Sequence, residues 1–288
     1  MNNVKTAGLL AFMTILLVLV AQSMGVGVGG ALAFAAIFNL GAYFFSDKLA
    51  LRSSGARPVE EHELPSVYSI VRRLAQMTSM PMPRIYLMDS PQPNAFATGR
   101  SPKHAAVAVT TGILDVLTVE ELEAVLAHEL AHVRNRDILI SSIAAMLAAA
   151  LTIIARMAFW FGGGGNNREN PLGAIGAILA LIVGPIAAMF IRFAISRARE
   201  YEADATGAAI TGQPLHLASA LAKIGQATSR VPMRVNEATS QLFIENPLKA
   251  FGNRRGGSQF SRLFSTHPPI EDRIRRLQEM AYGGPISR

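Results

Sequence analysis

Residues 127–132 read Ala127-His128-Glu129-Leu130-Ala131-His132. Two histidines four residues apart lie about 40° apart around a helix of 3.6 residues per turn, so both imidazoles can reach one metal ion. Glu129 lies one position further on, where its carboxylate can approach a metal-bound water without itself being a ligand. This spacing on a helix is typical of a zinc site with a neighbouring general base. The stretch therefore predicts one zinc ion per chain, held partly by His128 and His132.

The composition predicts a membrane protein. Half of the 288 residues are hydrophobic and only 16% are charged, whereas charged residues make up roughly 25% of soluble domains. The stretches 6–46, 138–155 and 171–191 contain no charged residue. The first is long enough for two spans of about 20 residues, with a glycine-rich turn between them. We expect four transmembrane helices, at residues 6–24, 28–46, 138–160 and 171–191.

The positions of lysine and arginine predict how these spans are oriented. The glycine-rich turn carries no charge, and the connection at 161–170 carries only Arg168 against Glu169. The opposite ends of the spans are flanked by Lys48, Arg52, Arg57, Arg134, Arg136, Arg192, Arg197 and Arg199. Because positive charge is retained on the cytoplasmic side, we expect the termini and residues 47–137 in the cytoplasm. The net charge of +7 then reflects topology and contact with the lipid bilayer, and nucleic acid is not an expected partner.

The first apolar run has a second interpretation, as a cleaved signal peptide. Ala21-Gln22-Ser23 has the small-x-small pattern of a cleavage site. The length of the apolar core, and the second apolar run that follows at once, favour a retained span. The orientation of everything after residue 47 is the same in either case.

The remaining segments predict a mainly helical domain with a small sheet. Thr118-Val119-Glu120-Glu121 is a capping box, which starts the helix of the motif at Thr118, and this helix is expected to continue to about Asp137. Because an apolar run follows at once, we expect the metal site at the surface of the bilayer. Further helices are expected at 65–77, 215–226 and 270–280, and strands at 84–88, 94–99 and 105–110.

The predicted fold class is mainly α, with four transmembrane helices and a cytoplasmic α+β domain with a small sheet. Its motif is typical of a zincin-like metalloprotease domain. The expected boundaries are a transmembrane hairpin at 1–46, a cytoplasmic part with the motif at 47–137, a second transmembrane hairpin at 138–191, and a second cytoplasmic part at 192–288. The first residues after 46 are expected to form a linker that leaves the membrane.

A catalytic zinc ion usually has three protein ligands and keeps one position for water. The chain has no cysteine, so the third ligand must be His, Asp or Glu. The candidates on the cytoplasmic side are Asp137, Glu200, Glu202, Asp204, His216 and His267. On a continuous helix Asp137 falls off the face of the two histidines, whereas Glu200 and Asp204 share a face of their own helix. We therefore expect Glu200 to be the ligand and Asp204 to orient a ligand histidine.

Several separated motifs resemble those of one family. These are His128-Glu129-Leu130-Ala131-His132, Asn94-Ala95-Phe96-Ala97-Thr98-Gly99, Ser196-Arg197-Ala198-Arg199-Glu200-Tyr201-Glu202-Ala203-Asp204, Leu242-Phe243-Ile244-Glu245-Asn246-Pro247 and Ser265-Thr266-His267-Pro268-Pro269. Together they resemble HtpX-type membrane zinc metalloproteases, distant relatives of the CAAX prenyl endopeptidases. The resemblance runs from the first span to the last helix, so it covers nearly the whole chain.

The resemblance implies a zinc endopeptidase that uses Glu129 as its catalytic base. It implies cleavage of membrane or misfolded proteins on the cytoplasmic side, in quality control under stress. It also implies that Asn94 begins an edge strand to which a substrate peptide adds, and that His267 and Arg273 lie near the substrate or the oxyanion. Together with a basic, glycine- and alanine-rich chain, it suggests a multi-pass protein of a bacterial inner membrane with its catalytic domain facing the cytoplasm.

Other interpretations stay open. An intramembrane metalloprotease would bury its motif within a span, whereas Arg134, Arg136 and Asp137 favour a position at the membrane surface. A non-catalytic zinc-binding membrane scaffold would keep the metal for structure alone and would leave Glu129 without a role. The natural substrates and the oligomeric state are not fixed by the sequence, nor is whether the segment 231–262 covers the cleft as a lid.

Overall fold

The computed structural model of the chain describes residues 2–23, 26–135, 137–143, 197–233, 235, 240–247 and 268–283. Its helices are α1 (Asn2–Ser23), α2 (Val28–Ser53), α3 (Pro65–Met77), α4 (Thr111–Val116), α5 (Val119–Arg134), α8 (Arg197–Thr211), α9 (Pro214–Thr228) and α12 (Ile270–Ala281), with short 3-10 turns at η1 (Pro102–His104) and η2 (Ser240–Leu242). Its strands are β1 (Arg57–Pro58), β2 (Arg84–Met88), β3 (Ala95–Thr98) and β4 (Ala106–Thr110). The chain is therefore mainly helical with a small mixed sheet, as predicted.

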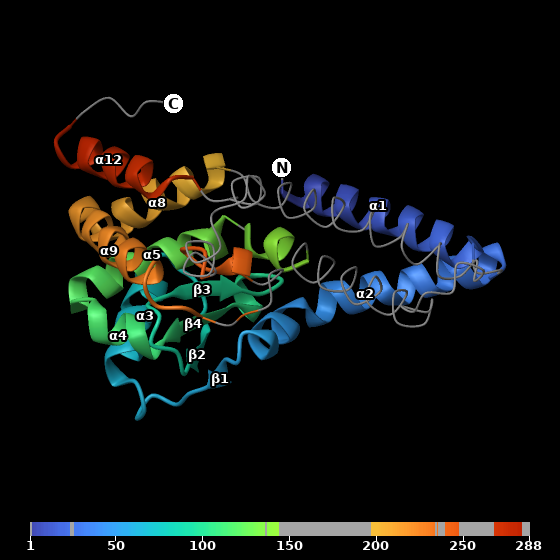
Figure 1. The fold of residues 1–288 in the computed structure, drawn as a ribbon, viewed down its shortest axis with the longest axis horizontal. Helices are drawn as coiled ribbons and strands as arrows, with labels where there is room; N and C mark the ends of the chain where they lie inside the picture. Colours follow the sequence, from blue (N-terminus) through green and yellow to red (C-terminus); the bar gives the residue numbers. More distant parts are fainter. Residues whose placement is uncertain are drawn as a thin grey trace, which may run out of the picture.

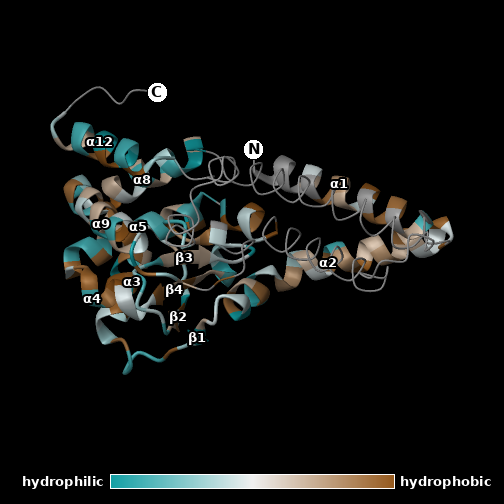
Figure 2. Cartoon of the chain, in the orientation of Figure 1, coloured by the Kyte–Doolittle hydropathy of each residue, from teal (hydrophilic) through white to brown (hydrophobic). Residues whose placement is uncertain are grey.

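The helices α1 and α2 lie side by side and project together from the compact part of the molecule (Figure 1). Of the residues that the structure describes, α2 is long and apolar enough to cross a membrane, and α1 contains a shorter apolar stretch, Leu10–Leu19. Hydrophobic residues occur along the length of both helices (Figure 2). The predicted span 171–191 and all of 138–160 except residues 138–143, which are helical, lie outside the described residues. The number of four spans therefore stays a prediction.

The end of α2 differs from the prediction. The helix continues to Ser53, whereas a linker was expected to begin at Asp47. The charge of Asp47 does not end the helix because this side chain is buried and accepts a hydrogen bond of 2.9 Å from Arg84 Nη2. This contact connects the end of α2 directly to strand β2.

The sheet has the strand order β1-β2-β4-β3. β2 and β4 are parallel, and the two outer pairs are antiparallel. The expected strands at 84–88, 94–99 and 105–110 are confirmed to within a residue at each end, whereas β1 was not predicted because two residues carry no alternating pattern. β3 pairs with β4 on one side only and is an edge strand of this sheet, so its other side can accept a further chain segment.

The two faces of the sheet pack against different parts of the chain. Val107 and Val109 face one cluster, which contains the apolar sides of α3, α5 and α9. Phe96 and Ala108 face a second cluster, which contains Leu51 of α2. Because side chains alternate between the faces of a strand, strand β4 is buried on both sides. The core therefore fixes the edge strand β3 relative to the motif helix α5.

The helices α8, α9 and α12 lie stacked beside α5 (Figure 1). The helix α8 comes close to α5 at Gly207, where a Cβ atom would lie 2.9 Å from His128 N and 3.0 Å from His128 Cα. A side chain at this position would push the two helices apart. The glycine thus lets α8 cross α5 at the motif and brings the first turn of α8 over the histidines.

Candidate metal centre

The motif helix α5 begins as the sequence predicted. The Thr118 side chain accepts a hydrogen bond from Glu121 N, and the Glu121 carboxylate accepts one from Thr118 N. This reciprocal pair satisfies two amide groups that the helix itself leaves without partners. The helix ends at Arg134, earlier than expected. Its last two turns carry the histidines, whose rings lie 4.8 Å apart between centroids and are almost perpendicular.

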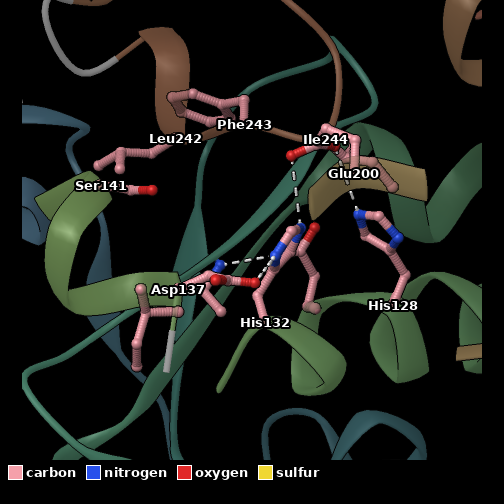
Figure 3. Close-up of a pocket in the computed structure, with 11 residues that line it drawn as sticks. His128, His132, Asp137, Ser141, Glu200, Leu242, Phe243 and Ile244 are labelled. Atoms are coloured by element: carbon pink, nitrogen blue, oxygen red, sulfur yellow. Dashed lines mark hydrogen bonds and ion pairs between the residues drawn. The ribbon is translucent and has the colours of Figure 1, made fainter. Parts of the chain in front are cut away.

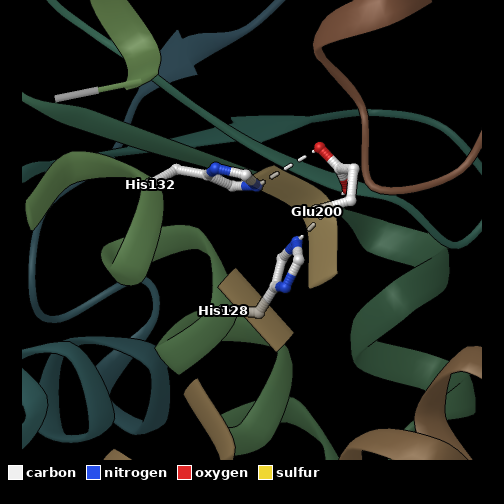
Figure 4. A group of neighbouring side chains, drawn as sticks. All are labelled: His128, His132 and Glu200. Atoms are coloured by element: carbon white, nitrogen blue, oxygen red, sulfur yellow. Dashed lines mark ion pairs between the residues drawn. The ribbon is translucent and has the colours of Figure 1, made fainter. Parts of the chain in front are cut away.

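Glu200, in the first turn of α8, faces both imidazoles (Figure 4). Its Oε1 lies 3.5 Å from His132 Nε2, and its Oε2 lies 3.9 Å from His128 Nε2. One donor atom from each of the three side chains lies within 4.8 Å of the others. Bonds of about 2.0–2.2 Å in a tetrahedron separate the donor atoms of a zinc ion by roughly 3.4 Å. The three side chains therefore fit a zinc ion between them.

Each histidine faces Glu200 with Nε2 and contacts another carboxylate through its other ring nitrogen, Nδ1. His128 Nδ1 lies 3.0 Å from Asp204 Oδ1. His132 Nδ1 lies 3.4 Å from Asp137 Oδ2 (Figure 3). A carboxylate at Nδ1 favours the tautomer that is protonated there and leaves the lone pair of Nε2 directed at the metal position. Both imidazoles are thus oriented in the way that a metal site requires.

The structure places Asp204 beside His128, and it also places Asp137 beside His132, a contact that the sequence did not predict. A continuous helix would turn Asp137 away from the histidines. In the structure α5 ends before Asn135, and a new helical segment includes Asp137. With α5 ending at Arg134, the Asp137 carboxylate lies 3.4 Å from His132 Nδ1 and not on the far side of a continuous helix. No local spacing in the sequence reports this contact.

Arg273, on α12, is buried beside His128 and Glu200, with 1% of the residue exposed. Its Nε and Nη2 donate hydrogen bonds of 2.8 and 2.7 Å to the two oxygens of Asp204, and its Nη1 donates one of 3.2 Å to Ile244 O. The structure therefore places Arg273 against the carboxylate that orients His128. His267, the other residue of the predicted pair, lies outside the described residues.

Glu129 lies between the histidines and the edge strand. Its Oε2 accepts a hydrogen bond of 2.8 Å from Ala97 N in β3. Burial is the main cause that raises the pKa of Glu129 to about 7, and the charge of Glu200 adds to it. A carboxyl group whose pKa is near neutral can both accept and return a proton at physiological pH.

The charges around the two histidines differ. Burial lowers the pKa of His128, and the nearby Arg273 acts in the same direction. Burial also opposes charge on His132, but Asp137, Glu200 and Glu129 outweigh it and raise its pKa to about 9. Three carboxylates around one imidazole stabilise positive charge at this position, which is what a divalent cation provides. For the acid Asp204, burial acts in the opposite direction and raises the pKa. The charge and hydrogen bonds of Arg273 outweigh burial and hold this pKa at about 2, so the carboxylate stays ionised.

The space in front of the histidines is a small pocket of about 40 Å³. At about 10–15 Å³ for each water-sized group, it can hold an ion and a water but no peptide. Its lining includes Ala97, His128, Glu129, His132, Glu200, Leu242, Phe243 and Ile244 (Figure 3). The segment 240–247 therefore forms one wall of the pocket.

This wall is attached to the outer side of β3. Ile244 N donates a hydrogen bond of 2.9 Å to Ala95 O. Asn94, which precedes the strand, is buried, and its Nδ2 donates a hydrogen bond of 2.8 Å to Glu245 O. Asn94 thus holds the wall in place, and a peptide that added to β3 at Ala95 would have to displace Ile244.

A motif helix with two histidines, a carboxylate from a second helix as the third donor, and an edge strand beside Glu129 together define a metallopeptidase. Residues 61–281 match the sequence model of Peptidase family M48. Two proteins named "Protease HtpX homolog" are similar over nearly the whole chain. The one from Pelotomaculum thermopropionicum is 50% identical over 98% of this chain and 100% of its own length, and the one from Thermodesulfovibrio yellowstonii is 49% identical over 98% and 99%. The chain belongs to peptidase family M48, and the resemblance to HtpX-type proteases is confirmed.

A solved structure, Ste24p from S. mikatae, shares the fold. Its TM-score is 0.52 at 18% identity, and the match covers 96% of this chain. This chain spans 65% of the length of that protein's chain. At this identity the likeness concerns the fold alone.

Substitution of Asp137 by asparagine tests the contact that the sequence did not predict. The amide cannot carry the negative charge that stabilises His132, so we expect the affinity for zinc to fall by about 10–100-fold, as for other outer partners of ligand histidines. Competition with a fluorescent chelator measures this change. Asp89→Asn, at an exposed aspartate, is the matched control. Equal affinity in both variants would show that Asp137 does not orient His132.

Proposed function

We propose that this chain is a membrane-anchored zinc endopeptidase that cleaves membrane or misfolded proteins on the cytoplasmic side of a bacterial inner membrane. One observation carries this proposal. The donor atoms of His128, His132 and Glu200 converge within 4.8 Å of one another, and the Glu129 carboxylate lines the same pocket. Membership of a peptidase family agrees with this arrangement.

The proposed roles of the residues follow from their positions. His128 and His132 would hold the zinc ion through Nε2, and Glu200 through its carboxylate. Zinc at this position would supply Lewis-acid polarisation of the scissile carbonyl and of the attacking water. Glu129 takes a proton from the water and later gives it to the leaving amine. The hydrogen bond from Ala97 N keeps this carboxylate pointed at the pocket.

The substrate peptide is proposed to add to the outer edge of β3 in place of the segment 240–247. Main-chain hydrogen bonds to an edge strand provide affinity with little preference for sequence, which suits the cleavage of many unfolded chains. The segment 240–247 already uses Ala95 O, and the pocket is too small for a peptide. Substrate binding therefore requires this segment to move away from β3.

The proposed location rests on the pattern of charges and on the position of the site. The motif helix is followed after one break by the helical residues 137–143, where the third apolar run of the sequence begins. The family relatives are named as proteases, and a role in quality control under stress is what the resemblance to HtpX-type enzymes implies. The natural substrates would then be damaged or misassembled proteins of the same membrane.

Removal of the metal separates this proposal from the alternative of a non-catalytic zinc-binding membrane scaffold. We expect the purified chain to cleave unfolded casein, to lose this activity on treatment with 1,10-phenanthroline, and to regain it when zinc is added back. The reason is that polarisation of water and carbonyl depends on the bound ion. The non-chelating 1,7-phenanthroline is the control. A chain that binds zinc but cleaves casein neither before nor after chelation would support the scaffold.

Single cysteines test the proposed orientation, since the chain has no cysteine of its own. We expect Lys103→Cys, in the exposed turn after β3, to be protected from a membrane-impermeant maleimide in intact cells. Val26→Cys, at the exposed turn between α1 and α2, should be labelled under the same conditions. Labelling of both residues after solubilisation in detergent is the control. The reverse pattern would place the catalytic domain on the outer side.

A further inference from the structure

A second hollow lies on α2, apart from the metal centre. It is an open groove of about 490 Å³. Its lining is Ile37, Leu40, Gly41, Phe44, Phe45, Lys48 and Arg100. The apolar residues of the groove are strongly exposed, with values of 70% for Ile37 and 57% for Phe45. The groove thus presents an uncovered apolar surface that ends in two positively charged side chains.

The two cations are held over the aromatic end of the groove. The Arg100 guanidinium lies 5.3 Å from the centre of the Phe44 ring and donates a hydrogen bond of 3.4 Å to Phe44 O. The Lys48 ammonium lies 5.6 Å from the centre of the Phe45 ring. Within the part of the chain that the structure describes, neither cation has a carboxylate at ion-pair distance. Both positive charges therefore remain available to a ligand.

The position of the groove indicates what this ligand is. α2 is the helix that is long and apolar enough to cross a membrane, and Lys48 lies in its last turns. Arg100 comes from the other part of the molecule, directly after β3. A ligand that fits both ends must have an apolar chain at the depth of the bilayer and an anionic group at the interface. This is the chemistry of an anionic phospholipid.

We propose that the groove binds one anionic phospholipid. Its phosphate contacts Lys48 and Arg100, and an acyl chain lies along Ile37, Leu40 and Phe44. The proposal rests on the proposed placement of α2 in the membrane and not on the proposed chemistry of the metal centre. In this proposal the positive charges of Lys48 and Arg100 at this end of α2 serve to bind one lipid molecule.

The same lipid would connect the bilayer to the substrate edge. Arg100 follows Gly99, whose φ of +140° suits glycine and where a Cβ would lie 2.5 Å from His104 O. Thr98, the last residue of β3, shares a hydrogen bond of 2.7 Å between hydroxyls with Ser142. The chain between the strand and Arg100 is therefore closely confined, so a headgroup held by Arg100 fixes this end of β3.

The test is titration of the full-length protein in detergent with phosphatidylglycerol or phosphatidylcholine, with the bound lipid counted by native mass spectrometry. We expect the protein to prefer phosphatidylglycerol. Neutralising both cations in Lys48→Gln/Arg100→Gln should weaken this binding by about 25-fold, or about fivefold for each cation, and should weaken the binding of phosphatidylcholine less, because its choline cation offsets the charge of its phosphate. The double variant Lys103→Gln/Arg230→Gln removes the same charge at exposed positions that do not line the groove and should bind as the parent does.

Two further measurements keep the result unambiguous. Lys48→Arg/Arg100→Lys retains both charges and should retain the preference, which excludes a general loss of structure. Inorganic phosphate, tested as a competitor, should not displace phosphatidylglycerol, because it has no acyl chain for the groove. Equal binding of the two lipids, equal losses in the two neutralised variants, or displacement by phosphate would overturn the proposal. Because the titration does not measure cleavage, its failure would leave the proposed peptidase function untouched.

Discussion

Replacement of Glu129 by glutamine should lower the rate of casein cleavage by about 10²–10⁴-fold, the usual contribution of a general base, and leave one zinc ion per chain in place. Glutamine has the same shape, and its amide oxygen can still accept the hydrogen bond from Ala97 N. It cannot take a proton from water. The zinc ligands His128, His132 and Glu200 are unchanged, so the metal should remain. Initial rates and elemental analysis of the same preparation measure both quantities.

The matched control is Glu120→Gln, at an exposed glutamate of the same helix, which should retain normal cleavage. A Glu129→Gln protein that cleaved casein at the parental rate would refute the role of this residue. A protein that lost both cleavage and zinc would show that Glu129 supports the metal site itself. The two measurements together therefore separate a chemical role from a structural one.

Replacement of Glu200 by alanine should remove both the metal and the activity. The carboxylate is the third of the side chains that converge on the metal position, and its loss leaves two histidines from a single helix. We expect the affinity for zinc to fall by more than the roughly 10–100-fold that is typical of an outer partner. Zinc content after dialysis against a weak chelator, and casein cleavage in zinc-free buffer, measure the effect.

Glu202 is a close control for this prediction because it lies on the same helix but is exposed. Glu202→Ala should keep its zinc and its activity. Full zinc content in Glu200→Ala would mean that another carboxylate completes the site, and Asp137 would then be the first candidate.

The parts of the site that local spacing determines could be predicted from the sequence. The capping box at Thr118 fixed the start of the motif helix, and the separation of four residues placed Glu200 and Asp204 on one face of their helix. The strands 84–88 and 105–110 could be predicted because each is a short run of mostly apolar residues that is bounded by turn residues. In each case a short-range pattern determines where the side chain points.

The rest depends on contacts between segments that are distant in the sequence. Ile244 pairs with β3, and Arg273 bonds to Asp204, although each pair is far apart in the sequence. A local periodicity of the sequence cannot predict such contacts. Asp137 was misplaced because one break in a helix changes the direction of all that follows. The proposed spans beyond residue 143 lie outside the described residues and stay a prediction.

The contact between Arg273 and Asp204 has a consequence for biosynthesis. Both histidines and Glu200 leave the ribosome before α12 does, yet Asp204 is an ionised group in the protein interior whose partner is on that helix. Until α12 has been translated and has packed in place, Asp204 lacks the positive charge of Arg273. It then cannot hold the imidazole of His128 in its orientation. We expect incompletely translated chains to be inactive for this reason. They could then not cleave other nascent chains of the same protein.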